Sequence, residues 1–219
     1  GGHGGTPDNG GAAGNHLMTT LLDTFKRWLG YAPANRPADS APGLTAQQIK
    51  NAMNPTTAAN GNRILKGDGT WPFVVEVDGE DLVMRNVTAT AFGGANDIHD
   101  NGQTASGVST KANPQCLGCA LPMHYDGKDK ATKEAQYGSP IPGMPWFQKV
   151  RVTAKGKSIE VRLIDRGPAK WAKDQIDLTV AAARFFDSKA TANRFSLKVD
   201  EVRILGAAKY APKAEGALK

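Results

Sequence analysis

The chain has 219 residues, of which 40% are apolar and 22% charged, a composition that excludes wholesale disorder. Lys and Arg outnumber Asp and Glu by 27 to 21, and the net charge of +6 favours polyanionic partners such as an anionic cell-wall polymer. The basic residues are scattered rather than clustered, so we expect no nucleic-acid binding. No apolar run approaches the roughly 18 residues of a membrane span, which excludes a transmembrane helix.

The sequence of residues 1–43 predicts an attachment segment rather than a folded domain. Residues 1–14 are mostly glycine and small polar residues, typical of a flexible leader, and lack the pattern of a secretory signal. Residues 15–30 predict an amphipathic helix, because apolar side chains recur every three or four positions from Leu17 to Leu29. This stripe must dock on the rest of the chain, a second copy, another protein or a membrane surface. The three prolines of residues 31–43 indicate a semi-rigid linker.

Residues 44–84 predict a small adaptor without a core of its own. A short helix begins at Thr45, and the Asp68-Gly69 and Asp78-Gly79 pairs each lie between short β-favouring pieces, which is typical of hairpin turns.

Residues 85–210 predict a mainly β domain, and residues 211–219 a tail. Alternating apolar residues predict strands over Val87–Phe92, Lys149–Thr153, Ser158–Ile164 and Ser196–Leu205, with one helix over Thr179–Phe186. Short strands and one late helix favour a small barrel with a helical insert. The loops over 93–115 and 124–145 are long enough to predict a functional role.

Four motifs occur in order along this domain: T-A-S-G at 104–107, A-L-P at 120–122, D-R-G-P at 165–168 and I-D-L-T at 176–179, the last followed by an alanine-rich segment. Together they resemble the double-psi β-barrel family of rare lipoprotein A, the expansins and the family 45 endoglucanases. The resemblance spans about residues 87–206. It implies a six-stranded double-psi β-barrel with short helices, and a groove that binds polysaccharide and often cleaves it.

The resemblance also implies two catalytic carboxyl groups. Asp177 matches the groove aspartate that acts as general acid in the cellulases, and Asp165 ends the preceding strand near the same groove. Glycoside cleavage needs one protonated carboxyl group at the leaving oxygen, and hydrolysis usually needs a second. A lytic transglycosylase needs no second one, because the muramyl sugar's own hydroxyl attacks. The alternatives are structural: Asp177 as the cap of a helix, and Asp165 as part of a turn.

The sequence departs from rare lipoprotein A at two points. Val108 and Thr110 stand where the family has a Glu and an Asp, and Gly118 or Cys119 falls near the family's histidine. The roles of those family residues therefore do not transfer. His99 and Asp100, in the loop before T-A-S-G, are candidate helpers of the two aspartates, although a loop histidine is often only solvated.

The remaining candidates would bind substrate. We assign Thr104 and Ser106 of T-A-S-G to the groove, while Arg166 either clamps a substrate carboxylate or pairs with a neighbouring acid. Trp146 either stacks on a sugar ring or belongs to the barrel core.

Cys116 and Cys119 form a C-x-x-C pair that Gly118 and Pro122 indicate to be in a loop. A local disulfide and two free thiols both fit. Without a second pair, a zinc site is not expected, and nothing predicts a metal ion or a cofactor.

The segment R-I-L-K-G-D-G-T-W at 63–71 resembles segments that recur in bacteriophage tail-fibre and baseplate proteins. The two resemblances together predict a wall-active barrel of lytic transglycosylase or glycosidase type that binds and cleaves peptidoglycan. The 15–30 helix would join it to other tail proteins or to a second copy. The virion tail, the periplasm or the cell exterior would be its location. The alternative is a non-catalytic barrel that binds the wall or serves structurally in a tail.

Overall fold

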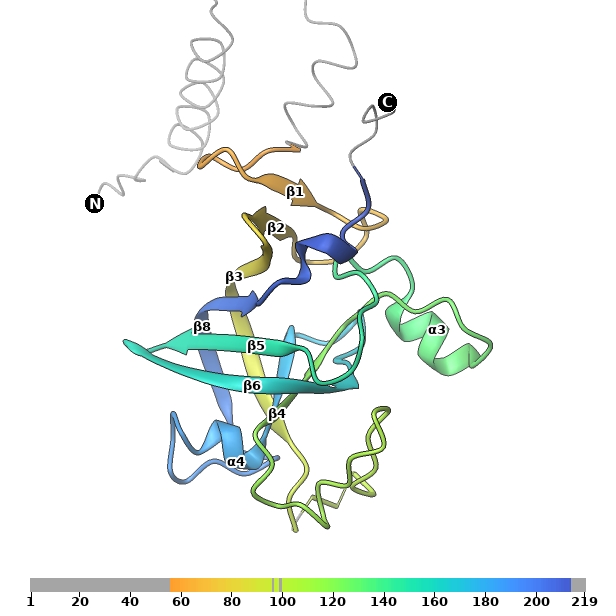
Figure 1. Cartoon of the computed structure of the whole chain (residues 1–219). Coiled ribbons are helices and arrows are strands. Elements are labelled where there is room, and N and C mark those ends of the chain that lie inside the picture. The colour runs from red at the N-terminus through yellow and green to blue at the C-terminus, as the bar shows by residue number, and fades with distance from the viewer. Residues whose placement is uncertain (1–55, 96, 99, 214–219) are drawn as a thin grey trace, which may run out of the picture. The chain divides into compact units, whose positions relative to one another are not determined.

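The computed structural model describes residues 56–95, 97–98 and 100–213, all of them within a compact unit that spans residues 51–219 (Figure 1). The helix predicted over 15–30, the 31–43 linker, the short helix beginning at Thr45 and the 214–219 part of the tail lie outside the described residues. None of the helices in the described part is long and apolar enough to cross a membrane.

The described residues form eight strands and three short helices. The strands are β1 Arg63–Leu65, β2 Val75–Asp78, β3 Asp81–Phe92, β4 Gly118–Leu121, β5 Lys149–Ala154, β6 Lys157–Arg166, β7 Ile176–Thr179 and β8 Ser196–Ile204. The helices are α3 Lys130–Gln136, α4 Val180–Ala183 and the 3₁₀ helix η1 Ala207–Tyr210.

Six of the strands close into a barrel, which confirms the mainly β fold class and the six-stranded barrel. The order around it is β3-β7-β4-β6-β5-β8, and β8 pairs back onto β3. The β3–β7 and β4–β6 pairs are parallel, and the other four are antiparallel. Closure leaves these six strands without an open edge. In Figure 1, β5 and β6 cross in front of β3, β4 and β8.

Apolar side chains fill the barrel, because alternate residues of each strand point inward. Val150, Val152 and Ala154 of β5 are fully buried in the core, as are Ile176 and Leu178 of β7. Small barrels of this kind are packed through the middle, so ligands must bind on the outside or at the ends.

The strand β3 joins two segments that the sequence pattern separates. Leu82 and Met84 face the core, then the phase shifts and Val87 and Ala89 face it. Asn86 lies at the phase shift with a φ of 54°, a left-handed conformation that Asn tolerates better than most residues, while the register with β8 stays the same on both sides of it. This change of phase explains why alternation predicts two pieces here. The strand also runs across the predicted boundary between residues 84 and 85.

Two further strands, β1 and β2, extend the sheet beyond β3 (Figure 1). The predicted turn at Asp78-Gly79 is confirmed, because Asp78 pairs with Asp81 across it and Gly79 has a φ of 59°. The Asp68-Gly69 turn is instead part of a longer connection, residues 66–74, between β1 and β2. Its backbone is bonded to another loop, since the Asp68 amide donates to the Gly138 carbonyl at 2.8 Å.

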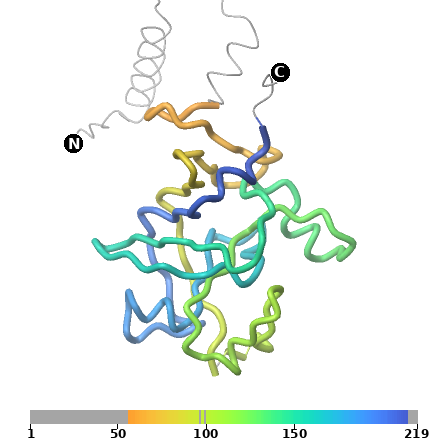
Figure 2. Tube along the Cα trace, in the orientation of Figure 1, coloured from red at the N-terminus to blue at the C-terminus, as the bar shows by residue number. Residues whose placement is uncertain are grey.

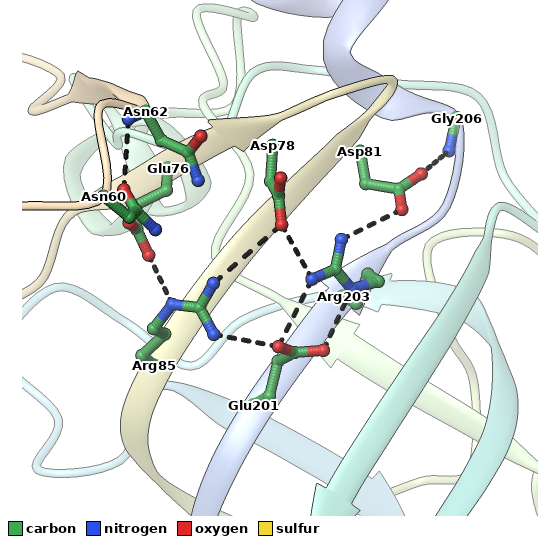
Figure 3. Close-up of polar contacts among 9 residues, drawn as sticks. All are labelled: Asn60, Asn62, Glu76, Asp78, Asp81, Arg85, Glu201, Arg203 and Gly206. Carbon is green, nitrogen blue, oxygen red and sulfur yellow. Dashed lines mark hydrogen bonds and ion pairs between the residues drawn. The ribbon is translucent and has the colours of Figure 1, made fainter. Parts of the chain in front are cut away.

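A cluster of two arginines and four acids fastens this extension to the barrel (Figure 3). Arg203 of β8 contacts Asp78 at 2.9 Å, Asp81 at 3.2 Å and Glu201 at 2.9 Å. Arg85 of β3 contacts Glu201 at 2.9 Å and Glu76 at 2.6 Å. The carboxylates lower the energy of both guanidinium ions, so the pKa of Arg85 is raised, the Glu76 hydrogen bond being the largest cause. The cluster joins β2, β3 and β8 through side chains.

Several predicted elements differ from the structure. The helix expected over Thr179–Phe186 is only α4, Val180–Ala183. Residues 124–145 are not all loop, because α3 begins after Asp129, whose carboxylate accepts the Thr132 amide at 3.0 Å. The C-x-x-C pair is only partly in a loop: Cys116 precedes β4, whereas Cys119 lies within this strand, whose four residues are all buried. In Figure 2 the trace of residues 100–117, in yellow-green, lies beyond one end of the barrel before the chain enters β4.

Candidate active site

Four side chains lie in one row across neighbouring strands on the outer face of the barrel. Thr90 of β3 is in register with Asp177 of β7, Asp177 with Ala120 of β4, and Ala120 with Asp165 of β6. Residues in register point to the same face of a sheet. The neighbours Cys119 and Leu178 are in the core, so this row points away from it. The structure thus places the two predicted aspartates on one face, on either side of the alanine methyl group.

A β-bulge brings Asp165 to this face. Val161 and Leu163 of β6 point into the core, and simple alternation would send Asp165 inward as well. The register shifts between Cys119 and Ala120, so that Cys119 pairs with Leu163 but Ala120 pairs with Asp165. The extra residue turns the following side chain to the opposite face. Bulges of this kind often re-aim a side chain beside an active site.

Asp177 shares its surroundings with a second carboxyl group. The Thr90 hydroxyl bonds to Asp177, and it also lies 2.8 Å from an Asp174 carboxylate oxygen. A hydroxyl has one hydrogen, so it donates to one carboxylate at a time. The other carboxyl group gains a bond only by carrying a proton itself. Two carboxyl groups held this close cannot both ionise easily, so the pair retains a proton.

The electrostatics assign that proton to Asp177. Burial raises the pKa of Asp177 from 3.8 to about 7, with the Asp174 hydrogen bond as the next largest cause and the Asp174 and Asp165 charges adding to it. The Thr90 hydrogen bond opposes this rise by stabilising the ionised form. The predicted role of Asp177 as a helix cap is wrong, because the Thr179 hydroxyl accepts the Ala182 amide and caps α4.

Asp165 joins two of the motifs. One of its carboxylate oxygens accepts the Ala105 amide at 3.0 Å and the Arg166 amide at 2.9 Å, and the Ser106 amide donates to the Ile164 carbonyl at 3.1 Å. The T-A-S-G loop is therefore bonded to the end of β6. Burial raises the pKa of Asp165 and the Asp100 charge adds to this, while the two amide bonds lower it. Asp165 thus accepts backbone hydrogen bonds, as the structural alternative expects.

The other predicted loop residues mainly hold the loop together. The Thr104 hydroxyl lies 2.9 Å from the Ser106 hydroxyl and 2.8 Å from the Val108 carbonyl. Asp100 accepts the Gly102 amide at 2.8 Å, an Asx turn, and its charge reaches Asp165. His99 lies outside the described residues.

Arg166 and Trp146 lie together at the end of β6. The Arg166 guanidinium is 4.8 Å from the centre of the Trp146 ring and 4.7 Å from that of Tyr125, so two aromatic faces hold it. Trp146 is also partly buried against the core. Of the two predicted roles of Trp146, its contacts match packing in the fold: the ring lies against the core and against the Arg166 guanidinium.

The described part of the chain contains no cluster of side chains suited to binding a metal ion. No group of three or more His, Cys, Asp or Glu residues there could hold a metal ion. Cys116 and Cys119 are free thiols, and burial raises the pKa of each. The His124 ring nitrogen Nδ1 accepts the Gly138 amide at 2.9 Å, a structural role.

A separate hollow of about 880 Å³ lies away from the aspartates. Its lining includes Arg63 and Lys66 from the β1 segment, His124 and the 139–143 loop, and neither Asp165 nor Asp177. We place the candidate site at the aspartates nonetheless, because the perturbed carboxyl groups are there.

Sequence reasoning missed Thr90 and Asp174. Asp174 stands three residues before Asp177, and its acidic side chain was the one available signal. The sequence held no signal for Thr90, because this residue is 87 positions from Asp177 and meets it only through the pairing of β3 with β7.

No family model and no curated protein matches the chain. Among solved structures, a Streptomyces papain inhibitor is similar in part, with 17% sequence identity and a TM-score of 0.35. The match covers 61% of this chain and 98% of the inhibitor.

Proposed function

We propose that the barrel is of the double-psi type and that it binds and cleaves cell-wall glycan, with Asp177 as the general acid. The fold assignment draws on two parallel strand pairs within a closed ring of six strands. It also draws on the direct contact between T-A-S-G and D-R-G-P, through the Ala105 amide and the Asp165 carboxylate. The order of the four motifs in the sequence supports the same assignment.

One observation carries the catalytic proposal: a half-buried carboxyl group that keeps its proton near neutral pH. Asp177 lies on the outer face of the barrel beside a second carboxyl group, and its pKa is raised to about 7. A general acid works best when its pKa lies near the working pH, because it is then protonated often enough and still releases the proton readily. Ordinary surface aspartates, with a pKa near 3.9, are ionised at neutral pH and have no proton to give.

The spacing of the two predicted acids is too wide for a retaining glycosidase and close to the roughly 6.5–9.5 Å between carboxyl groups that inverting enzymes use. Asp165 and Asp177 are both in register with Ala120, so they are two strand spacings apart, about 10 Å between Cα atoms. Side chains on the convex outer face of a barrel diverge rather than converge. A retaining glycosidase needs its carboxyl groups only about 5 Å apart, so Asp165 is badly placed as a nucleophile.

Lytic transglycosylation needs only the protonated carboxyl group of Asp177. Asp177 gives its proton to the glycosidic oxygen as the bond from the muramyl C1 to that oxygen breaks. The C6 hydroxyl of the same muramyl sugar then bonds to C1 and returns its proton to the Asp177 carboxylate. Every proton is accounted for, no water is consumed, and the product is a 1,6-anhydro sugar. Asp174 holds the proton on Asp177 between turnovers, and Asp165 anchors the T-A-S-G loop to the end of β6.

The test is release of muropeptides from purified murein sacculi by the full chain. Anhydro-muramyl ends are expected, whereas new reducing ends would mean hydrolysis and so contradict the single-acid reaction. Asp177→Asn should abolish release, and Asp200→Asn, at an exposed position of β8, should not. Full activity of Asp177→Asn would overturn the acid assignment.

A second candidate, non-catalytic binding to the wall, has one observation in its favour. The T-A-S-G loop carries Val108 in place of a carboxylate, and the Thr104 and Ser106 hydroxyls bond to each other and to the loop backbone. Sacculi that retain the protein in a pull-down but release no muropeptide would favour this candidate. Attachment to a phage tail through residues 15–30 remains a prediction.

A further inference from the structure

A large aromatic side chain stands exposed close to the candidate acids. Trp171 is 72% exposed, in the segment 167–175 that connects β6 with β7. The tryptophans of the described residues otherwise have structural partners: Trp71 is buried and its indole donates to the Tyr137 carbonyl, and Trp146 packs on Arg166. An exposed indole leaves a large apolar surface in water, which the fold itself does not need.

The backbone that carries Trp171 is held on both sides. The Lys170 amide donates to the Ala135 carbonyl of α3 at 3.0 Å, and the Ala172 amide to the Ala169 carbonyl at 2.9 Å. Further on, the Gln175 amide donates to the Thr88 carbonyl at 2.9 Å. The indole is therefore presented by an anchored segment, which reduces the entropy lost when a ligand binds to it.

Chain length keeps the indole near the site. Trp171 is three residues before Asp174, so the two Cα atoms are at most about 11 Å apart even if the chain between them is fully extended. Asp174 in turn shares the Thr90 hydroxyl with Asp177. A polymer whose scissile bond lies at Asp177 would place a neighbouring sugar within reach of the indole.

We propose that Trp171 is the stacking platform of a sugar subsite next to the acid, for one ring of a wall glycan strand. The proposal rests on the function proposed above and adds a specificity-determining residue to it. A pyranose ring has an apolar face of C–H groups that packs flat on an indole, and binding sites are commonly lined by such rings. The exposed Lys173 lies two residues further on, and its charge suits the carboxylates that wall glycan carries.

The experiment compares binding of soluble, uncrosslinked murein glycan strands by the full chain and three variants, in short incubations on ice. Trp171→Ala should weaken binding about tenfold, whereas Trp171→Phe, which keeps a flat ring, should lose much less. Phe185→Ala is the matched control, because this 41% exposed ring lies beyond α4, past the other end of β7. Bound strands should also protect part of the tryptophan fluorescence from iodide quenching, and Trp171→Phe should remove that protection.

Thermal unfolding of each variant separates binding from folding, and we expect Trp171→Ala to unfold at the wild-type temperature because the side chain is exposed. Wild-type binding with Trp171→Ala would overturn the subsite while leaving the proposed function intact. Equal losses in Trp171→Ala and Trp171→Phe would overturn stacking. A wild-type chain that neither binds nor cleaves the strands would overturn both proposals.

Discussion

Replacing Asp177 by asparagine should change how stability depends on pH, even in the absence of substrate. The carboxyl group has a pKa of 3.8 in the unfolded chain and about 7 in the folded one. Between these values the folded protein holds a proton that the unfolded chain has released. The free energy of unfolding therefore falls as pH rises through this window, by about 1.4 kcal/mol for each pH unit and by about 4 kcal/mol in all. Above pH 7 and below pH 3.8 the effect is constant.

Asp177→Asn removes the titrating group, so the variant should gain about 4 kcal/mol relative to wild type between pH 4 and pH 8. Urea unfolding at half-unit pH steps measures this difference, and titrations that the two proteins share cancel from it. Because the proton belongs to a coupled pair, Asp174→Asn should flatten the same window in part. The free energy of unfolding of Asp200→Asn should change with pH in parallel with that of wild type. Parallel curves for Asp177→Asn and wild type would refute the protonated carboxyl group and the proposed acid with it.

Three further substitutions test the surroundings and the scaffold. Thr90→Val should destabilise the fold by about 1 to 3 kcal/mol in urea unfolding, because it leaves half-buried carboxyl groups short of a donor, and should shift the Asp177 window to higher pH. Gly67→Ala should lower the unfolding temperature sharply, since φ is +59° and the new Cβ would lie 2.0 Å from the Gly138 carbonyl oxygen; a loss below about 1 kcal/mol would contradict the overlap. Arg203→Gln should cost about 1 to 2 kcal/mol at neutral pH and less in acid, where its partners are protonated; a cost unchanged at low pH would contradict an electrostatic origin.

Alternation along the chain predicts the long strands of the barrel well. Lys149–Thr153 and Ser158–Ile164 lie inside β5 and β6, and Ser196–Leu205 differs from β8 by one residue. Each of these strands has one face in the core and one toward solvent, so its sequence shows the period of two. Alternation does not predict β4 and β7, because each has four residues that are buried almost throughout. The count of six strands came from the resemblance.

The candidate site is predictable only in part, for a similar reason. Asp165 and Asp177 were found through motifs, but their common face depends on the bulge opposite Ala120, which local sequence does not encode visibly. The partners of Asp177 depend on pairing between distant strands, and the proton they share is a property of burial rather than of residue type. Trp171 was overlooked because an exposed tryptophan and a buried one look alike in a sequence.

The two-strand extension has a mechanical consequence. A pull applied to the chain at residue 56 would act first on β1, which is three residues long and pairs with β2 as an antiparallel hairpin. A hairpin loaded at its open end unzips one hydrogen-bond pair after another and resists weakly. The load would next meet the connection over residues 66–74, which Asp68 and Trp71 bond to the loop around Gly138. It would then reach the Arg85 and Arg203 cluster at Asp78, and finally β3, whose twelve residues are bonded to β8 along most of their length. We therefore expect β1 to unfold under tension before the barrel, so that the barrel and its carboxyl pair stay folded.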